Sequence, residues 1–152
     1  MEHVLEKSWQ IPNQLPAMSA AAKEVFSWLA NQPLPSRAKY SVGLAVEELI
    51  TNMIRYGYDD DREHIIRFSI TIHPDYLKIV FEDDGHPFDP TSYPPPDLER
   101  IVTSSRAGGL GIQLVRKITS SMTYERDGHI NRNTLKIRRV EPGDTQVIRL
   151  NL

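Results

Sequence analysis

The chain contains no cysteine among its 152 residues. This absence excludes disulfides, thiolate zinc sites, iron–sulfur clusters and cysteine nucleophiles, and it is compatible with a reducing cytoplasm. No apolar run approaches the length that spans a membrane. The charged start, Met1-Glu2-His3, is followed by no apolar stretch like that of a signal peptide. We therefore expect a cytoplasmic protein without a membrane segment.

Strong net charge is also lacking, because 18 basic residues nearly balance 20 acidic ones and leave a formal charge of −2. Such a balance gives no argument for a nucleic acid or a membrane surface as a partner. The length and the 39% hydrophobic content predict one globular domain over residues 1–152. Glycine is scarce, with 8 residues against 11 prolines, so the positions of the glycines are informative.

Hydrophobic periodicity divides the chain into strands and helices. The expected strands cover residues 3–11, 65–73, 76–82, 122–127, 133–140 and 145–151. The expected helices cover residues 17–31, residues 36–56 and the stretch from the glycines near 108 to about 121. Because the strands come mainly in hairpins, we predict an α+β fold. In this two-layer sandwich the helices pack on one face of a mixed, mostly antiparallel sheet.

The 36–56 segment is the strongest helix, with Ser36 placed to cap its start and Gly57 where a helix end favours glycine. Residues 84–109 break the pattern with five prolines, which is typical of a binding loop, a lid or a linker. Within that segment, residues 97–102 could form a short helical turn.

Glu48 and Asn52 lie four residues apart on the 36–56 helix and therefore share a face. Together they could hold a hard cation and orient a hydroxyl or a water. Taken alone, the pair is better explained as the exposed face of an amphipathic helix, where such residues are common. Against this, Glu48 flanks the apolar stripe that contains Ala45 and Leu49, where a carboxylate is costly to place.

The second polar stretch, Asp83-Asp84-Gly85, follows the 76–82 strand. A carboxylate there can accept a hydrogen bond from an exocyclic amine, and glycine lets the backbone approach a flat ring closely. An Asp-Gly pair is also common in plain turns, so the stretch alone is a weak indication.

The third stretch places Gly108, Gly109 and Gly111 just before a helix. Backbone N–H groups at a helix start attract phosphate, although a flexible hinge would use the same residues. The stretch is not a dinucleotide fingerprint, because the last glycine of that motif is missing and a loop precedes it. No Gly-Lys-Ser/Thr occurs in the chain, so it is not a P-loop.

In order and spacing, the three stretches resemble the boxes of the GHKL (Bergerat-fold) ATPase superfamily. They are most similar to those of the anti-sigma-factor serine-protein kinases of bacterial partner-switching systems. The resemblance covers roughly residues 1–140. The matching segments are the N-box at 45–52, the G1 box at 83–90, the G2 box at 108–112 and a closing Asn133-Thr134.

The resemblance implies a role for each matching residue of the first two boxes. Glu48 is expected to act as the general base, and Asn52 to hold the Mg²⁺ that bridges the phosphates. Asp83 is expected to receive the adenine amino group, and Gly85 to let the ring lie close.

The later segments are expected to contact the phosphates and to support the base. Gly109 and Gly111, with Gly108 in the same box, match the phosphate-side glycines. Thr134 matches the threonine that supports the adenine end, and Arg106 could reach the γ-phosphate from an ATP lid at about 88–107.

The activity that the resemblance implies is that of an ATP- and Mg²⁺-dependent protein-serine kinase. It would phosphorylate a serine on a small antagonist protein, bind a sigma factor or an equivalent regulator, and form a homodimer. The alternative is a non-catalytic ATP/ADP-binding module that switches partners by nucleotide state. A structural domain with accidental motifs remains as a third interpretation.

Overall fold

The computed structural model describes residues 4–92 and 108–144. The predicted strand at 145–151, the predicted turn at 97–102, Arg106 and most of the predicted lid lie outside these residues. In the described part of the chain, no helix is both long enough and apolar enough to cross a membrane.

A five-stranded sheet forms one layer of the molecule, with strand order β1-β2-β3-β5-β4. Its strands are β1 (Leu5–Pro12), β2 (Ile65–Ile72), β3 (Tyr76–Asp83), β4 (Ser121–Asp127) and β5 (Ile130–Arg138). All neighbouring strands of this sheet run antiparallel. The described sheet is therefore not mixed, because the β4–β5 hairpin reverses the chain before β5 pairs with β3.

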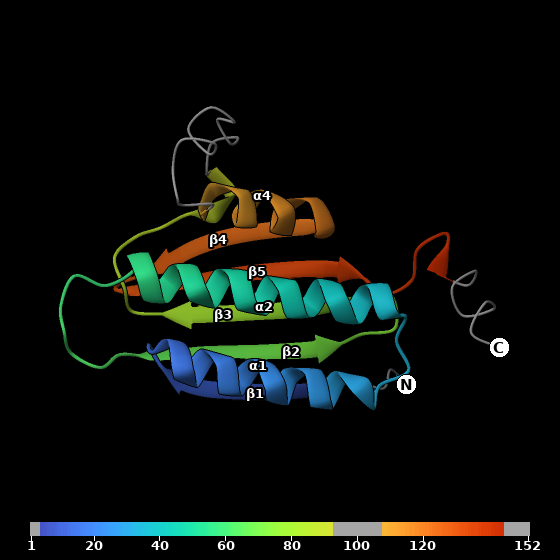
Figure 1. Cartoon of the computed structure of the whole chain (residues 1–152). Coiled ribbons are helices and arrows are strands. Elements are labelled where there is room, and N and C mark those ends of the chain that lie inside the picture. The colour runs from blue at the N-terminus through green and yellow to red at the C-terminus, as the bar shows by residue number, and fades with distance from the viewer. Residues whose placement is uncertain (1–3, 93–107, 145–152) are drawn as a thin grey trace.

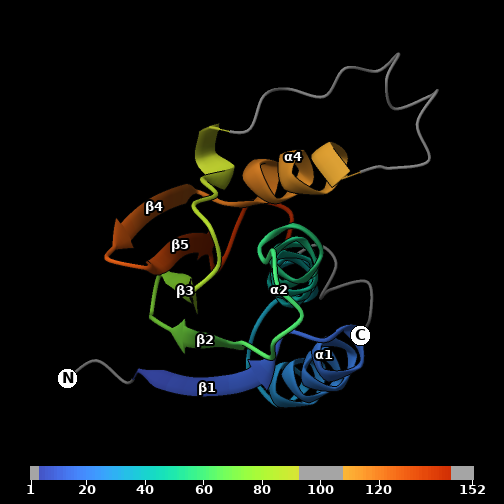
Figure 2. The same cartoon turned by 90° about the vertical axis from the view of Figure 1, so that its left-hand side faces the viewer.

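Three described helices form the second layer: α1 (Leu15–Ala30), α2 (Ser36–Tyr56) and α4 (Gly108–Ile118). They lie over the same face of the sheet (Figure 1), and the view along the strands shows the other face without a helix (Figure 2). A short 3₁₀ turn, Pro90–Ser92, follows the end of β3. The predicted α+β sandwich is confirmed.

The core lies between the two layers and has α2 at its centre, packed against both α1 and α4. The apolar stripe predicted for α2 is buried throughout, as is the alternate set of side chains along β3. Fully buried members of this core include Phe81, Leu29, Ile50, Ile66, Ile70, Leu77, Ile79, Ile112, Leu135 and Ile137. This packing fixes both edges of α2, one of which carries Glu48 and Asn52.

Of the two residues predicted for the ends of α2, Ser36 needs correction and Gly57 lies at the helix end as expected. Ser36 does not cap the helix: it is the first helical residue, and Pro35 occupies the cap position without a side-chain hydrogen bond. Gly57 is the C-terminal cap, but its φ of −87° is not left-handed. Its N–H donates to the Met53 carbonyl at 2.8 Å, and a Cβ at Gly57 would overlap that carbonyl. Position 57 therefore requires glycine because there is no room for a Cβ, and not because of its φ.

The last hairpin begins earlier than the 133–140 prediction. β5 starts at Ile130, after a tight turn in which Gly128 has a left-handed φ of 61°. A two-residue hairpin requires positive φ, which glycine adopts without strain. As a result, Asn131 joins the strand and pairs directly with Asp83 of β3.

Candidate nucleotide-binding site

A pocket lies where α2 ends, between that helix, the end of β3 and the start of β5. Its walls combine apolar side chains with a few polar ones, as is usual for sites that bind small molecules. The polar side chains of the pocket wall include Asn52, Asp83, Asn131 and Asn133. Two of them, Asn52 and Asp83, are residues that the sequence singled out.

Asp83 is the last residue of β3 and is only 6% exposed. Its Oδ1 accepts hydrogen bonds from the Gly85 N–H at 2.8 Å and from Asn131 Nδ2 at 3.0 Å. In the part of the chain that the structure describes, both hydrogen bonds to this carboxylate end on Oδ1, which leaves Oδ2 to accept one from a ligand. Burial raises the pKa of Asp83, while the bonds from Asn131 and Gly85 oppose that rise.

Gly85 lies directly against the end of α2. A Cβ at this position would overlap the Gly57 carbonyl oxygen, and the next N–H, that of His86, donates to the same oxygen at 2.9 Å. The structure therefore requires glycine here for a close backbone approach. The group that Gly85 approaches in the structure is the Gly57 carbonyl at the end of α2. The approach of Gly85 to a flat ring stays a prediction.

Glu48 lies between α2 and α4, against Gly111. A Cβ at Gly111 would overlap the Glu48 carboxylate, so the glycine leaves the space that the carboxylate occupies. Burial, and then the like charge of Glu47, raise the pKa of Glu48, and Arg55 acts in the opposite direction. The side chain is thus not simply part of an exposed polar face, and its raised pKa suits a general base.

Asn52 lies one turn beyond Glu48 and carries a buried polar atom without a partner. Among the described residues, Asn52 Nδ2 and Asn133 Oδ1 are both buried and accept or donate no hydrogen bond. Such a group costs about 1–3 kcal/mol when it stays unpaired. Both residues line the pocket, so a ligand that pairs with them would remove this cost.

His64 ties the loop after α2 to the G1 segment. Its Nδ1 lies 3.1 Å from Asp84 Oδ1, and its Nε2 lies 2.8 Å from Asp60 Oδ1. The hydrogen bond with Asp60, and after it the one with Asp84, raise the pKa of His64. The bridge holds the segment next to Asp83 in place.

Two of the predicted contact residues are not placed at the pocket. Thr134 pairs with Val80 and Thr123, between Asn133 and Leu135, which are both buried toward the helices. Because side chains alternate along a strand, Thr134 faces the opposite side of the sheet, and its predicted contact with the adenine end is not supported. Arg106 lies outside the described residues.

The glycines of the G2 box lie at the start of α4. The helix begins at Gly108, so Gly108, Gly109 and Gly111 all belong to its first turn. The N–H groups of a first turn have no partner within their helix and can bind an anion. The structure thus places Gly111 beside Glu48 and keeps the other two glycines on the same turn.

Sequence reasoning missed Asn131 and named Asn133 only within the closing Asn133-Thr134, without a role. The two residues are 2% and 3% exposed. Both face the helix side of β5, and Tyr124 Oη donates to Asn131 Oδ1 at 2.6 Å. The signal was the alternation of asparagines in a segment whose other inward residues are apolar. The predicted strand begins only at residue 133 and therefore leaves Asn131 outside this alternation.

We expect Gly111→Ala to impair catalysis far more than folding. The added methyl would displace the end of the Glu48 side chain, which is flexible and can move at little cost in stability. A catalytic group misplaced by an ångström can cost about 10²-fold in rate. The check is the rate of phosphoryl transfer together with the thermal midpoint. Lys117→Ala, an exposed change on the same helix, is the control, and an unimpaired Gly111→Ala rate would contradict the prediction.

Comparison with known proteins identifies the family. The family model described as the histidine kinase-like ATPase domain matches residues 11–139. The chain belongs to the histidine kinase-like ATPase domain family. Within the matched range lie Glu48, Asn52, Asp83 and Gly111.

Two curated relatives of this ATPase domain are named as protein kinases. The serine/threonine-protein kinase BtrW of Bordetella bronchiseptica is 22% identical over 126 residues, which are 80% of this chain and 89% of BtrW. The serine-protein kinase RsbW of Staphylococcus aureus is 31% identical over 91 residues, 56% of this chain and 57% of RsbW. The match to RsbW thus spans little more than half of that protein's length.

Solved structures show the same fold. The RsbU and RsbW domains of a Mycobacterium tuberculosis protein match with a TM-score of 0.64 at 13% identity, over 91% of this chain and 33% of that one. The histidine kinase domain of an Erythrobacter litoralis blue-light-activated kinase matches with a TM-score of 0.54 at 14% identity, over 88% of this chain and 64% of that one. These ATPase domains therefore share one architecture across distant sequences.

Proposed function

We propose that this chain is an ATP-dependent protein-serine kinase and anti-sigma-type regulator of a bacterial partner-switching system. One observation carries the proposal: the Glu48 carboxylate, with its raised pKa, lies against Gly111 in the first turn of α4. A potential base thus stands beside N–H groups that can bind phosphate. The names of the relatives BtrW and RsbW support the same activity.

Phosphoryl transfer depends mainly on positioning and on neutralising charge. In the proposed reaction, a serine hydroxyl oxygen bonds to the γ-phosphorus, the bond from that phosphorus to the bridging oxygen breaks, and ADP leaves. Glu48 accepts the hydroxyl proton. Asp83 Oδ2 accepts a hydrogen bond from the adenine amino group, and the first turn of α4 holds the phosphates.

The residues present fit a Mg²⁺ that is held mainly by the nucleotide. In the described residues no group of three or more His, Cys, Asp or Glu side chains could hold a metal ion. Mg²⁺ commonly uses one or two protein ligands together with substrate phosphates. The amide oxygen of Asn52, a residue of the pocket wall, could supply such a ligand, and the ion would neutralise phosphate charge.

The proposal includes the partners and the setting of the reaction. The substrate would be a serine of a small anti-sigma-factor antagonist, and the second partner a sigma factor or an equivalent regulator. The active form would be a cytoplasmic homodimer in which each chain is a single domain over residues 1–152. The resemblance to switch-protein kinases supports this assignment.

Transfer of labelled γ-phosphate from ATP to a cognate antagonist protein tests the proposal. The alternative, a module that binds ATP or ADP without turnover, would show normal nucleotide binding and no transfer. A chain that binds no nucleotide in a calorimetric titration would contradict both. The kinase is favoured because a simple binding module has no need of Glu48 beside the glycine-rich turn.

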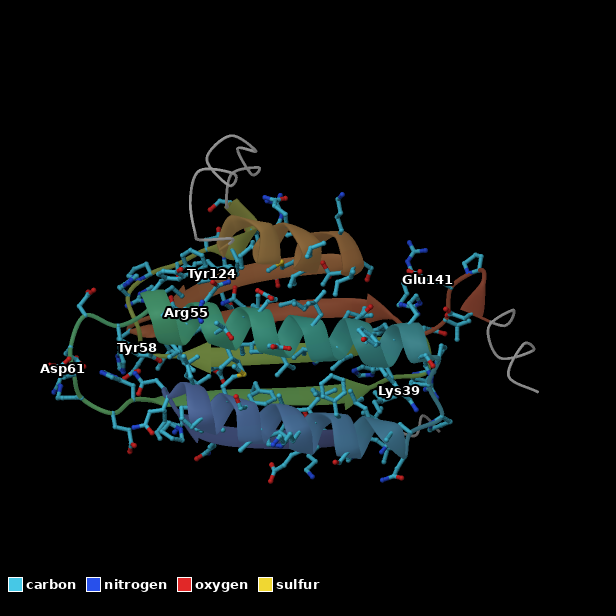
Figure 3. The ribbon with its side chains drawn as sticks, viewed as in Figure 1. Lys39, Arg55, Tyr58, Asp61, Tyr124 and Glu141 are labelled. Atoms are coloured by element: carbon cyan, nitrogen blue, oxygen red, sulfur yellow. The ribbon has the colours of Figure 1, made fainter. Side chains whose placement is uncertain are left out.

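The transfer rate should depend on pH through Glu48. Because its pKa is raised, the base loses its charge at a higher pH than an exposed glutamate does, and the rate falls as the pH drops through that pKa. Glu47→Gln removes a like charge and should move this acid limb to lower pH. Arg55→Gln removes the opposing charge near the end of α2 (Figure 3) and should move the limb to higher pH.

The measurement is the single-turnover rate across the acid range at saturating ATP. Opposite shifts for the two variants would identify Glu48 as the titrating group. Equal profiles for the wild type and both variants would contradict that assignment.

A further inference from the structure

Asp83 belongs to a row of polar side chains that crosses strands β3, β5 and β4. Asp83 of β3 pairs with Asn131 of β5, and Asn131 pairs with Arg126 of β4. These cross-strand partners point to the same face of the sheet. Tyr124 reaches the row diagonally from two residues earlier on β4. The proposed nucleotide-binding function uses only Asp83 of this row.

Asn131 is the centre of the row. Its Nδ2 donates to Asp83 Oδ1 at 3.0 Å, to the Gly85 carbonyl at 3.2 Å and to the His86 carbonyl at 3.1 Å. Its Oδ1 accepts from Tyr124 Oη at 2.6 Å and from Arg126 Nη1 at 2.8 Å. Arg126 Nη1 also donates to the Gly85 carbonyl at 3.0 Å.

The partners of Asn131 fix which way its amide points. An arginine guanidinium can only donate, so it requires the amide oxygen on the β4 side. The carboxylate and the two carbonyls can only accept, so they require the amide nitrogen on the β3 side. In a reversed amide, the NH₂ group would face the Arg126 guanidinium and the oxygen would face the Asp83 carboxylate and the two carbonyls. Donors would then meet donors and acceptors would meet acceptors, which leaves buried groups unpaired at a cost in free energy.

The polar atoms of Asn131 are fully engaged with the protein, although the residue lines the pocket. This distinguishes it from Asn133, whose Oδ1 has no partner in the described part of the chain. Asn131 therefore acts through Asp83. Together with the Gly85 N–H it occupies Oδ1, which leaves Oδ2 as the oxygen that can accept from a ligand.

We propose that Asn131 is a positioning residue that orients Asp83 for recognition of the adenine amino group, and that Tyr124 and Arg126 fix its amide in the required orientation. This inference rests on the proposed nucleotide binding and deepens it. It gives a part in the choice of base to the turn end of the β4–β5 hairpin, which contains no residue of the three boxes.

The test compares the affinities of ADP and IDP, whose bases differ in the amino or oxo group at position 6. The variants are Asn131→Ala, Tyr124→Phe and the double variant Tyr124→Phe/Arg126→Met. Thr123→Val is the matched control, because it also removes one hydroxyl from β4 but on the opposite, exposed side. Affinities come from calorimetric titration of the full chain.

The readout is the preference for ADP over IDP, which a general loss of stability would not change. We expect Asn131→Ala to reduce the preference by about tenfold, as for the loss of a hydrogen bond to a charged group. The double variant should reduce it as well, Tyr124→Phe less, and Thr123→Val not at all. The double variant also keeps the test valid should Asn131→Ala fail to fold.

Two results would overturn the inference, and they differ. If the wild type prefers ADP and the double variant keeps the full preference, the positioning role is wrong while nucleotide binding stands. If the wild type binds neither nucleotide, the proposed function itself fails and the positioning role fails with it.

Discussion

Glu48→Gln is expected to reduce phosphoryl transfer by about 10²–10⁴-fold, the usual contribution of a general base. Glutamine keeps the shape that fills the space beside Gly111 but cannot accept the serine proton. Nucleotide affinity should be largely retained, because in the proposed site the adenine amino group binds to Asp83 at the end of β3 and not to Glu48. The measurement is single-turnover transfer from labelled ATP, with ADP affinity determined in parallel.

Glu47→Gln is the matched control for this prediction. It changes the same residue type at the neighbouring position, which is exposed, and should preserve transfer at neutral pH. Wild-type transfer by Glu48→Gln would show that the base lies elsewhere. Loss of transfer together with loss of ADP binding would show that Glu48 holds the nucleotide and would contradict its assignment as the base.

Asp83→Asn is expected to weaken ADP binding by about 10- to 100-fold, because a hydrogen bond to a charged group contributes about 1.5–3 kcal/mol. The asparagine oxygen can still accept from Gly85 and Asn131 at the position of Oδ1. Its NH₂ group would then stand where Oδ2 does, and two donors would face each other at the adenine amino group. Because IDP carries an acceptor there, its binding should improve relative to ADP.

The measurement is calorimetric titration of both nucleotides into the variant. Stability should not fall, because the variant no longer buries a carboxylate whose pKa is raised by desolvation. Glu82→Gln is the control: it is the preceding residue but faces the other side of the sheet, where it pairs with Arg132 at 2.9 Å. An unchanged preference for ADP in Asp83→Asn would show that adenine is not recognised at this carboxylate.

Local patterns predicted most of the fold. The helical stripe of α2, the hairpin of β2 and β3 and the glycine-rich start of α4 all follow from side-chain spacing over a few residues. The same patterns identified Glu48, Asn52 and Asp83, because polar groups at the edge of an apolar element stand out from it. The role that the resemblance implied for Thr134 is not supported, since the face on which a strand residue lies depends on where the strand begins and how it pairs.

Gly57 and Gly85 also show that local patterns do not record contacts between distant segments. Both were recognised as glycines of a helix end and a turn, but the reason for glycine at position 85 is the carbonyl of position 57. That contact joins segments that are distant along the chain, and no local pattern records it. Likewise, the raised pKa of Glu48 arises from burial between α2 and α4.

The sequence by itself determined the α+β class, the order of the elements and the three stretches that resemble the ATPase boxes, because each of these is written in short-range spacing. Only the tertiary structure decided that Asn131 donates to Asp83 while Tyr124 and Arg126 donate to Asn131. It also decided that Glu48 lies against Gly111 and that Thr134 faces away from the pocket. These facts depend on strand register and helix packing, which join residues far apart in the chain. The scarce glycines illustrate both cases: their positions were visible in the sequence, but the neighbours that require glycine at 85 and 111 appear only once the chain is folded.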